Sequence, residues 1–219
     1  MNTIVSQILA QPQAYLLVKE IERALHDEHA KRQHFYDIID ENTKMEFING
    51  EIVYHSPVML RHNLVTKRVL HLVDFYVQIH NLGLVGVEKI LISLTRNDYE
   101  PDICYFRKEK ALHFTPKQAR FPVPDLIVEV LSDSTEEHDR TTKFMDYAAH
   151  GVEEYWIVNP ETEVLEQYRL ESVTMKYDLV VKSGNGIVES SVLSGFAIPI
   201  RAIFDDAANL DTVKNLLMP

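Results

Sequence analysis

The sequence contains little cysteine, glycine or positive charge, and each shortage counts against a class of protein. The 219 residues include one cysteine, Cys104, so no disulfide can form within the chain, which suits a reducing compartment. The seven glycines form neither G-x-x-x-x-G-K-S/T nor G-x-G-x-x-G, the loops that cradle nucleotide phosphates. A net charge of −11 counts against a protein that coats nucleic acid, because phosphate binding relies on lysine and arginine. This net charge is still compatible with an enzyme that binds nucleic acid transiently through a local basic patch.

Long apolar runs are also missing. No run reaches the roughly 18 residues needed to span a bilayer. The start, MNTIVSQILAQPQAY, lacks a basic segment followed by an apolar one, so we expect no secretory signal, no membrane partner and a cytoplasmic location. With 46% hydrophobic and 25% charged residues, the composition is that of a globular protein whose single domain can bury a full core.

Hydrophobic periodicity predicts helices between the strands. The expected helices cover about 13–33, a segment that Ser56-Pro57 opens and 81–83 closes, about 135–150, and roughly the last fifteen residues. Ser134 and Glu137 fit a capping box for the third of these helices, and Gly151 fits its end.

Strand signals occupy the rest of the chain. Strands are expected over 84–94, 102–106, 126–131 and 154–158, followed by two or three antiparallel strands between 163 and about 204. The run 126–131 is nearly all apolar, so we expect it to be central and covered on both faces. Mixed α/β is therefore the expected fold class.

Asn49-Gly50, between two apolar-rich runs, is a strong hairpin signal. A two-residue turn pairs Ile48 with Glu51 and puts Glu46 and Glu51 on one face. Either glutamate could supply an oxygen to a metal, and Glu51, directly after the turn, is slightly favoured. Exposed charges near a tight turn are nevertheless common, so on spacing alone both fit a plain surface role.

Glu129 and Asp102 are the strongest candidates for a site. Glu129 lies inside the strand DLIVEVLS, where an isolated ionised carboxylate costs several kcal/mol unless it is paired or binds a metal. Pairing with a core lysine or arginine is the alternative. Asp102 follows Pro101, and alone it fits an ordinary turn. On neighbouring strands, the two carboxylates would suit Mg²⁺ or Mn²⁺.

Lys143 lies on the helix that follows the Glu129 strand. Asp139, Lys143 and Tyr147 are spaced four apart and share a helical face. A functional interpretation puts the Lys143 ammonium beside an attacking water, although spacing alone favours a solvated lysine paired with Asp139. The ten histidines show no H-E-x-x-H and have no cysteine partners, which counts against zinc.

Several segments together resemble the PD-(D/E)XK restriction-endonuclease-like superfamily and, more closely, its Uma family of restriction endonucleases. The resembling segments run in the family's order over roughly 45–205: FINGEIVYHSP followed by Arg61-His62, EPDICYF, PDLIVEVLSDST, the positions Asp139, Lys143 and Tyr147, GVEEYWIVNP, and GFAIPIRAIF. PD alone is weak, whereas PDLIVEVLS followed by K…Y…GVEEYWIV is rather specific.

The resemblance implies a restriction-endonuclease-like core over 41–219, with a mixed central β-sheet flanked by helices and C-terminal antiparallel strands. Residues 1–40 would be a helical extension. Asp102 and Glu129 would bind Mg²⁺ or Mn²⁺, and Glu51 would match the upstream glutamate that often completes such sites. The lysine of Glu-x-Lys is absent, because Leu131 stands there, and the family is thought to move this lysine onto the following helix, at Lys143.

Two functions are consistent with these observations. The first is an Mg²⁺-dependent endonuclease, a phosphodiesterase acting transiently on DNA, for which we expect a homodimer. Its candidate DNA contacts are Arg61, Lys67, Arg68 and Arg140. The second is a catalytically inactive nuclease-fold module for binding or assembly, favoured by the leucine at 131 and by the acidic charge.

Overall fold

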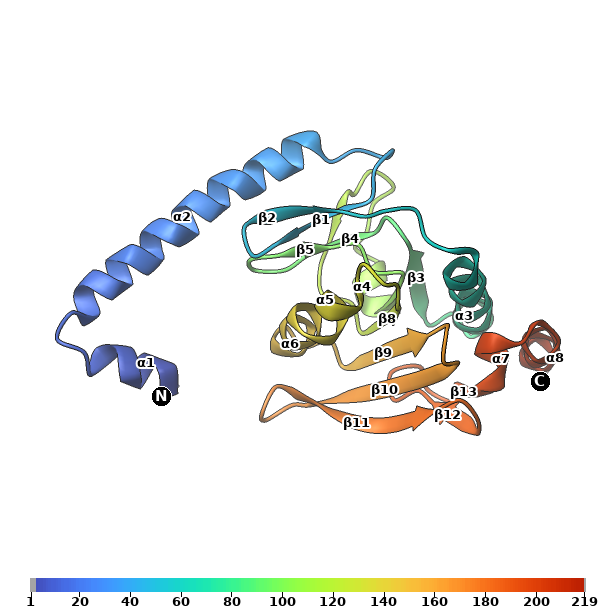
Figure 1. Cartoon of the computed structure of the whole chain (residues 1–219). Helices are drawn as coiled ribbons and strands as arrows, with labels where there is room; N and C mark the ends of the chain where they lie inside the picture. The colour runs from blue at the N-terminus through green and yellow to red at the C-terminus, as the bar shows by residue number, and fades with distance from the viewer. Residues whose placement is uncertain (1–2, 219) are drawn as a thin grey trace.

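The computed structural model describes residues 3–218, which begin with two helices on the outside of the molecule. These are α1 (Thr3–Leu9) and α2 (Ala14–Ile38), and Figure 1 shows α2 crossing the outer side, with α1 at its far end. The C-terminal part of α2 is anchored, because Phe35 is fully buried and Arg32 donates to Asp98 over 2.6 Å. Apolar side chains of the N-terminal part of α2 are exposed at Val18, Ile21 and Leu25.

The first sheet contains five short strands in the order β2-β1-β5-β4-β7. They are β1 (Met45–Ile48), β2 (Glu51–Tyr54), β4 (Leu91–Ser93), β5 (Asp98–Tyr99) and β7 (Arg120–Phe121). The predicted hairpin is confirmed, with Ile48 opposite Glu51 and Glu46 opposite Val53. Asn49 and Gly50 have φ of 51° and 84°, as a two-residue turn between twisted strands requires.

The second sheet contains six strands in the order β11-β10-β9-β8-β6-β3. They are β3 (Gly83–Val87), β6 (Ile103–Arg107), β8 (Leu126–Val130), β9 (Glu154–Asn159), β10 (Val164–Glu171) and β11 (Lys176–Ser183). The pair β8 and β9 is parallel and the other neighbours are antiparallel, so the sheet is mixed. β8 is central and wholly buried, as its apolar sequence predicts.

The remaining elements surround the two sheets. They are α3 (Leu60–Ile79), α4 (Lys108–Ala111), α5 (Glu136–Arg140), α6 (Thr142–Ala149), the small β12 (Ile187–Glu189) and β13 (Ala197–Pro199) pair, α7 (Arg201–Phe204) and α8 (Asp206–Leu217). Among residues 3–218, no helix is both long and apolar enough to cross a bilayer.

Three sequence predictions about element boundaries are wrong. The helix expected from Ser56-Pro57 begins at Leu60, because Met59 is extended, with ψ of 153°. The strand expected over 84–94 is divided between the two sheets, with Glu88 in the left-handed region between its parts. The helix expected over 135–150 breaks at Thr141, where φ is −123° and ψ is −81°, and no side chain caps its start.

The two faces of the six-stranded sheet carry separate hydrophobic cores. One face packs against α3, α7 and α8, in a core that includes Val69, Leu72 and Trp156. The other face packs against the first sheet and α6, in a core that includes Tyr147 and Ile157. Polar side chains that enter the space between the two sheets therefore meet in a dry environment.

Candidate active site between the two sheets

Asp102 and Glu129 are neighbours on adjacent strands of the six-stranded sheet. β6 and β8 pair antiparallel with Ile103 opposite Val128, which places Asp102, just before β6, next to Glu129. The backbone N–H of Asp102 donates to Glu129 Oε2 over 3.3 Å, and both side chains are buried. The structure thus brings together the two carboxylates that the sequence pointed to.

Asp102 accepts from three donors. Lys44 Nζ lies 3.0 Å from Oδ1, His62 Nε2 lies 3.1 Å from Oδ2, and the backbone N–H of Val130 donates to Oδ2 over 2.8 Å. Burial alone would raise the pKa of Asp102. The hydrogen bond from His62 and the charge of Lys44 outweigh this and hold the pKa well below its usual range, so Asp102 is an anion.

Lys143 stands among three carboxylates. Its Nζ lies 3.0 Å from Glu46 Oε1, 3.1 Å from Glu129 Oε1 and 3.1 Å from Asp139 Oδ1. Burial would lower the pKa of Lys143, but the three carboxylates hold it well above its usual value. The ammonium therefore stays charged inside the protein.

One lysine cannot hold all three buried carboxylates fully ionised. Burial and the neighbouring charges of Asp139, Asp102 and Glu46 together raise the pKa of Glu129 to about 8, against the lowering effect of Lys143. Tyr147 adds a hydrogen bond to Glu129 Oε1, of 3.0 Å. Glu129 is therefore the carboxylate that gains most from additional positive charge.

The hairpin delivers Glu46 to this cluster, while Glu51 lies elsewhere. Glu46 is fully buried and accepts the backbone N–H of Glu100 over 2.8 Å. The side chain of Glu51 is 76% exposed and pairs with Lys31 at 2.8 Å. Both glutamates lie on one hairpin face, as expected, but Glu51 is at the turn, beyond the space between the sheets. Of the two hairpin glutamates, Glu46 lies in the cluster with Lys143, and Glu51, expected there from the sequence, lies outside it.

Two residues in contact with Asp102 had been given no role from the sequence. His62 is buried, one turn before Val65 and Thr66 on the buried side of α3. A histidine among the apolar residues of a helix was the one sequence feature that could have indicated a role for it. Lys44 precedes β1 and reaches Asp102 across 58 residues of sequence, and no local pattern marks that contact.

The four candidate DNA contacts differ in availability. Arg68 is largely buried and donates to Asp206 over 2.7 Å. Arg140 donates to both oxygens of Glu166, over 3.1 and 3.0 Å. Arg61 lines a pocket of about 200 Å³ together with His62, and Lys67 is exposed on α3. Arg61 and Lys67 thus remain exposed, and Arg61 has only a 3.6 Å contact with Glu161, whereas Arg68 and Arg140 donate to acidic partners at 2.7–3.1 Å.

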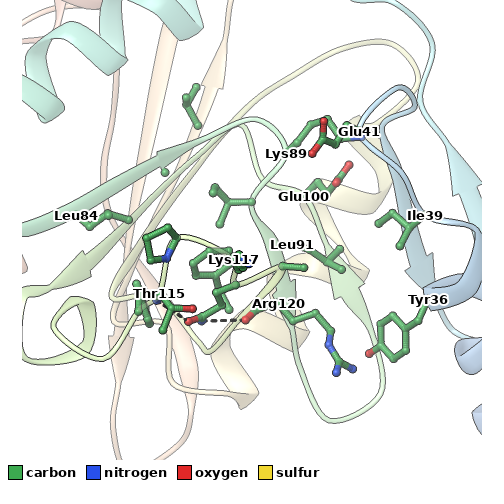
Figure 2. A pocket seen from close by; sticks show the side chains of 18 of the residues that line it. Tyr36, Ile39, Glu41, Leu84, Lys89, Leu91, Glu100, Thr115, Lys117 and Arg120 are labelled. Carbon is green, nitrogen blue, oxygen red and sulfur yellow. Dashed lines mark hydrogen bonds between the residues drawn. The ribbon is translucent and has the colours of Figure 1, made fainter.

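A larger cleft, of about 1480 Å³, lies between the end of α2, the β3–β4 segment and residues 111–121. Figure 2 shows Arg120 beside Tyr36 in this cleft, and the guanidinium lies 4.5 Å from the ring centroid. Lys89 and Glu100 lie together in another part of it. His62 lines the smaller pocket and contacts Asp102, so the smaller pocket borders the acidic site. The larger cleft includes Glu100, two residues before Asp102.

The donor chemistry of the site fits a hard divalent cation. Asp102 and Glu129 offer carboxylate oxygens from adjacent strands, the ligands that Mg²⁺ and Mn²⁺ prefer. An ammonium group 3.0 Å from Asp102 Oδ1 shows that a cation is accommodated there. Within residues 3–218, no three His, Cys, Asp or Glu side chains are arranged as a ready metal cage.

The fold and the sequence together define a restriction-endonuclease-like α/β protein. Residues 32–201 match the Uma2 family, described as "Putative restriction endonuclease". This match covers most of the sequence, and the chain belongs to the Uma2 family.

A solved structure supports the same fold. The chain is similar to a crystal structure of a "putative nuclease belonging to DUF820" from Anabaena variabilis ATCC 29413, with a TM-score of 0.66 and 16% identity. The similarity covers 78% of this chain and 94% of the other. At this identity the likeness establishes the fold alone. No curated protein matches the chain.

Proposed function

We propose that this protein is a metal-dependent nuclease that hydrolyses phosphodiester bonds in DNA. The observation that carries the proposal is that two buried carboxylates lie on neighbouring segments, with the backbone N–H of Asp102 donating to Glu129 and Lys143 Nζ 3.1 Å from Glu129. Membership of the Uma2 family supports the reaction class.

In this proposal Asp102 and Glu129 hold Mg²⁺ or Mn²⁺. A bound divalent ion lowers the pKa of water and offsets the charge of the scissile phosphate. Glu46 shares Lys143 with Glu129 and takes the supporting place that Glu51 was expected to fill. Leu131, at the position of the missing motif lysine, is buried and apolar, so the cation beside Glu129 is not on β8 but is Lys143 on α6.

DNA approaches, in this proposal, along the pocket that contains Arg61 and His62. Arg61 pairs with Glu161 at 3.6 Å, a loose contact between partly exposed groups that a phosphate can replace. The acidic charge of the whole chain makes this contact transient, because few cations are available to neutralise phosphates. A homodimer and a cytoplasmic location stay predictions.

A catalytically inactive nuclease-fold module is the alternative, and one observation favours it. Each of the four buried carboxylates lies within 3.1 Å of a lysine Nζ, so none of them lacks a cationic neighbour when no metal is bound. In that case the cluster would be a structural link between the sheets, and purified protein would show no Mn²⁺ binding that depends on Glu129.

The test is cleavage of plasmid and single-stranded DNA in Mg²⁺ or Mn²⁺, with Glu129→Ala beside the wild type. We expect nicking or cutting by the wild type that chelator and Glu129→Ala abolish. Glu51→Ala is the matched control, because it removes an exposed carboxylate from the same hairpin and should leave cleavage intact. Equal cleavage by folded Glu129→Ala would refute the assignment.

A further inference from the structure

The two lysines of the site differ in their access to solvent. The side chain of Lys143 is 3% exposed, and that of Lys44 is 21% exposed. An ammonium has three N–H donors. Lys143 has three carboxylate partners within 3.1 Å, so each of its donors already has an acceptor. A phosphate or water could reach Lys143 only after an ion pair had been broken in the buried cluster.

Lys44 has two carboxylate partners instead of three. Its Nζ lies 3.0 Å from Asp102 Oδ1 and 3.2 Å from Glu88 Oε2. The Glu88 side chain is itself partly exposed, which makes this second contact easy to exchange. One donor of Lys44 is left for an incoming oxygen, and a second becomes available when Glu88 moves away.

The position of Lys44 also suits contact with substrate. Lys44 precedes β1 in the first sheet and reaches across to Asp102, just before β6 in the second sheet. His62 contacts the other oxygen of Asp102 and lines the pocket that also contains Arg61. Lys44 is thus the partly exposed cation on Asp102, whose other oxygen contacts a residue of this pocket, His62.

We infer that Lys44 is the catalytic lysine, the group that contacts a non-bridging oxygen of the scissile phosphate, and that Lys143 is a positioning residue. This inference rests on the proposed nuclease function. It assigns the lysine role to a residue in the loop before the hairpin instead of to α6.

The step needs no change in the protonation of Lys44. In hydrolysis the oxygen of water bonds to phosphorus while one P–O ester bond breaks. The proton that water loses passes to solvent, and the leaving oxygen takes a proton from solvent. Negative charge gathers on the non-bridging oxygens between these events, and a fixed cation there lowers the barrier. The pKa of Lys44 is raised, because Asp102, Glu88 and Glu129 outweigh the effect of burial, so the cation persists.

A purely structural role for Lys44 predicts a different behaviour. An ion pair that only joins the sheets would, when removed, loosen the site and weaken metal binding and catalysis together. A catalytic role predicts that metal binding and catalysis respond differently. Removing Lys44 takes a competing cation away from Asp102, which favours metal binding, and it also removes the cation that stabilises charge on the phosphate, which slows catalysis.

The experiment uses the full-length chain as wild type, Lys44→Met, Lys44→Arg and Lys143→Met. Three quantities are measured: kcat and KM on plasmid DNA, Mn²⁺ affinity by calorimetric titration without DNA, and the midpoint of urea unfolding. Lys182→Met is the control, since Lys182 pairs with Glu166 on β10 and β11, outside the cluster.

We expect Lys44→Met to lower kcat by about 10²–10³, the loss seen when one stabilising group is removed from a reaction centre. Its Mn²⁺ affinity should be equal or higher, and Lys44→Arg should recover part of kcat. Lys143→Met should instead weaken Mn²⁺ binding and shift unfolding to lower urea.

Two outcomes overturn the inference in distinguishable ways. In the first, the wild type is active, and Lys44→Met either keeps its kcat or loses kcat and Mn²⁺ affinity in parallel. That result contradicts the catalytic role of Lys44 and leaves the nuclease proposal intact. A folded wild type that binds Mn²⁺ and cleaves neither duplex nor single-stranded DNA removes both.

Discussion

Lys143 on α6 and Glu129 on β8 are 14 residues apart in sequence, and their charged atoms lie 3.1 Å apart inside the protein. This contact fastens a helix to the central strand through groups that water does not reach. Glu46 and Asp139 share the same ammonium, so the lysine is the counter-ion of a whole cluster.

Replacing Lys143 by methionine should destabilise the fold strongly. The change leaves buried carboxylates without their cation, and breaking a buried ion pair by removal of one partner costs about 3–5 kcal/mol. Urea unfolding at pH 7, followed by circular dichroism, measures the free energy. Lys182→Met removes a partly exposed pair and should cost at most about 1 kcal/mol. A Lys143 variant as stable as this control would contradict the buried counter-ion role.

Glu46 and Glu51 offer a matched pair on one hairpin. Glu46→Gln should weaken Mn²⁺ binding and cleavage, because Glu46 shares the cation that positions Glu129. Glu51→Gln changes an exposed carboxylate and should shift stability by no more than about 0.5 kcal/mol. Titration calorimetry and plasmid cleavage compare the two variants. A larger loss of Mn²⁺ affinity in Glu51→Gln would restore the role that sequence spacing suggested for it.

The sequence predicted the two strand carboxylates of this site, but it did not predict all the residues that contact them. Asp102 and Glu129 were identifiable because each carboxylate stands at the start of, or inside, an apolar strand, and β6 and β8 are adjacent. Register also placed Glu46 and Glu51 on one face. The six-stranded sheet lies over only one end of the hairpin, and this arrangement depends on long-range packing. Residue spacing alone could therefore not show which of the two glutamates reaches the cluster.

Long-range contacts explain the other omissions. Lys44 lies in a short loop with no periodic pattern, and its partner is 58 residues away. Arg68 and Arg140 looked like surface cations because the sequence does not show Asp206 and Glu166 beside them. Local backbone conformation, at Met59 and Thr141, explains the misplaced helix boundaries.

Glu166 should make stability depend on acid pH. Burial would raise its pKa, but hydrogen bonds from Arg140, Tyr168 and Lys182 lower it to about 2. Because the pKa is lower in the folded than in the unfolded chain, the stabilisation is complete above the unfolded pKa, near 4.5, and is lost as the pH falls towards 2. The difference in unfolding free energy between wild type and Glu166→Gln should therefore shrink between pH 6 and pH 2.5. A difference that stays constant over this range would show that Glu166 is not held as an anion by these donors.

Arg61 and Arg68 should respond differently to truncation, although both lie on α3. Arg61→Ala removes an accessible cation at the pocket beside His62, so DNA affinity should fall and the slope of log affinity against log salt should decrease by about 1. Arg68→Ala breaks a pair with Asp206 that joins α3 to α8, so it should lower the urea midpoint and leave the salt slope unchanged. Fluorescence anisotropy with labelled DNA in chelator, at several salt concentrations, measures binding without cleavage. A salt slope that changes in Arg68→Ala and not in Arg61→Ala would place the DNA on the α8 side of α3, away from the acidic site.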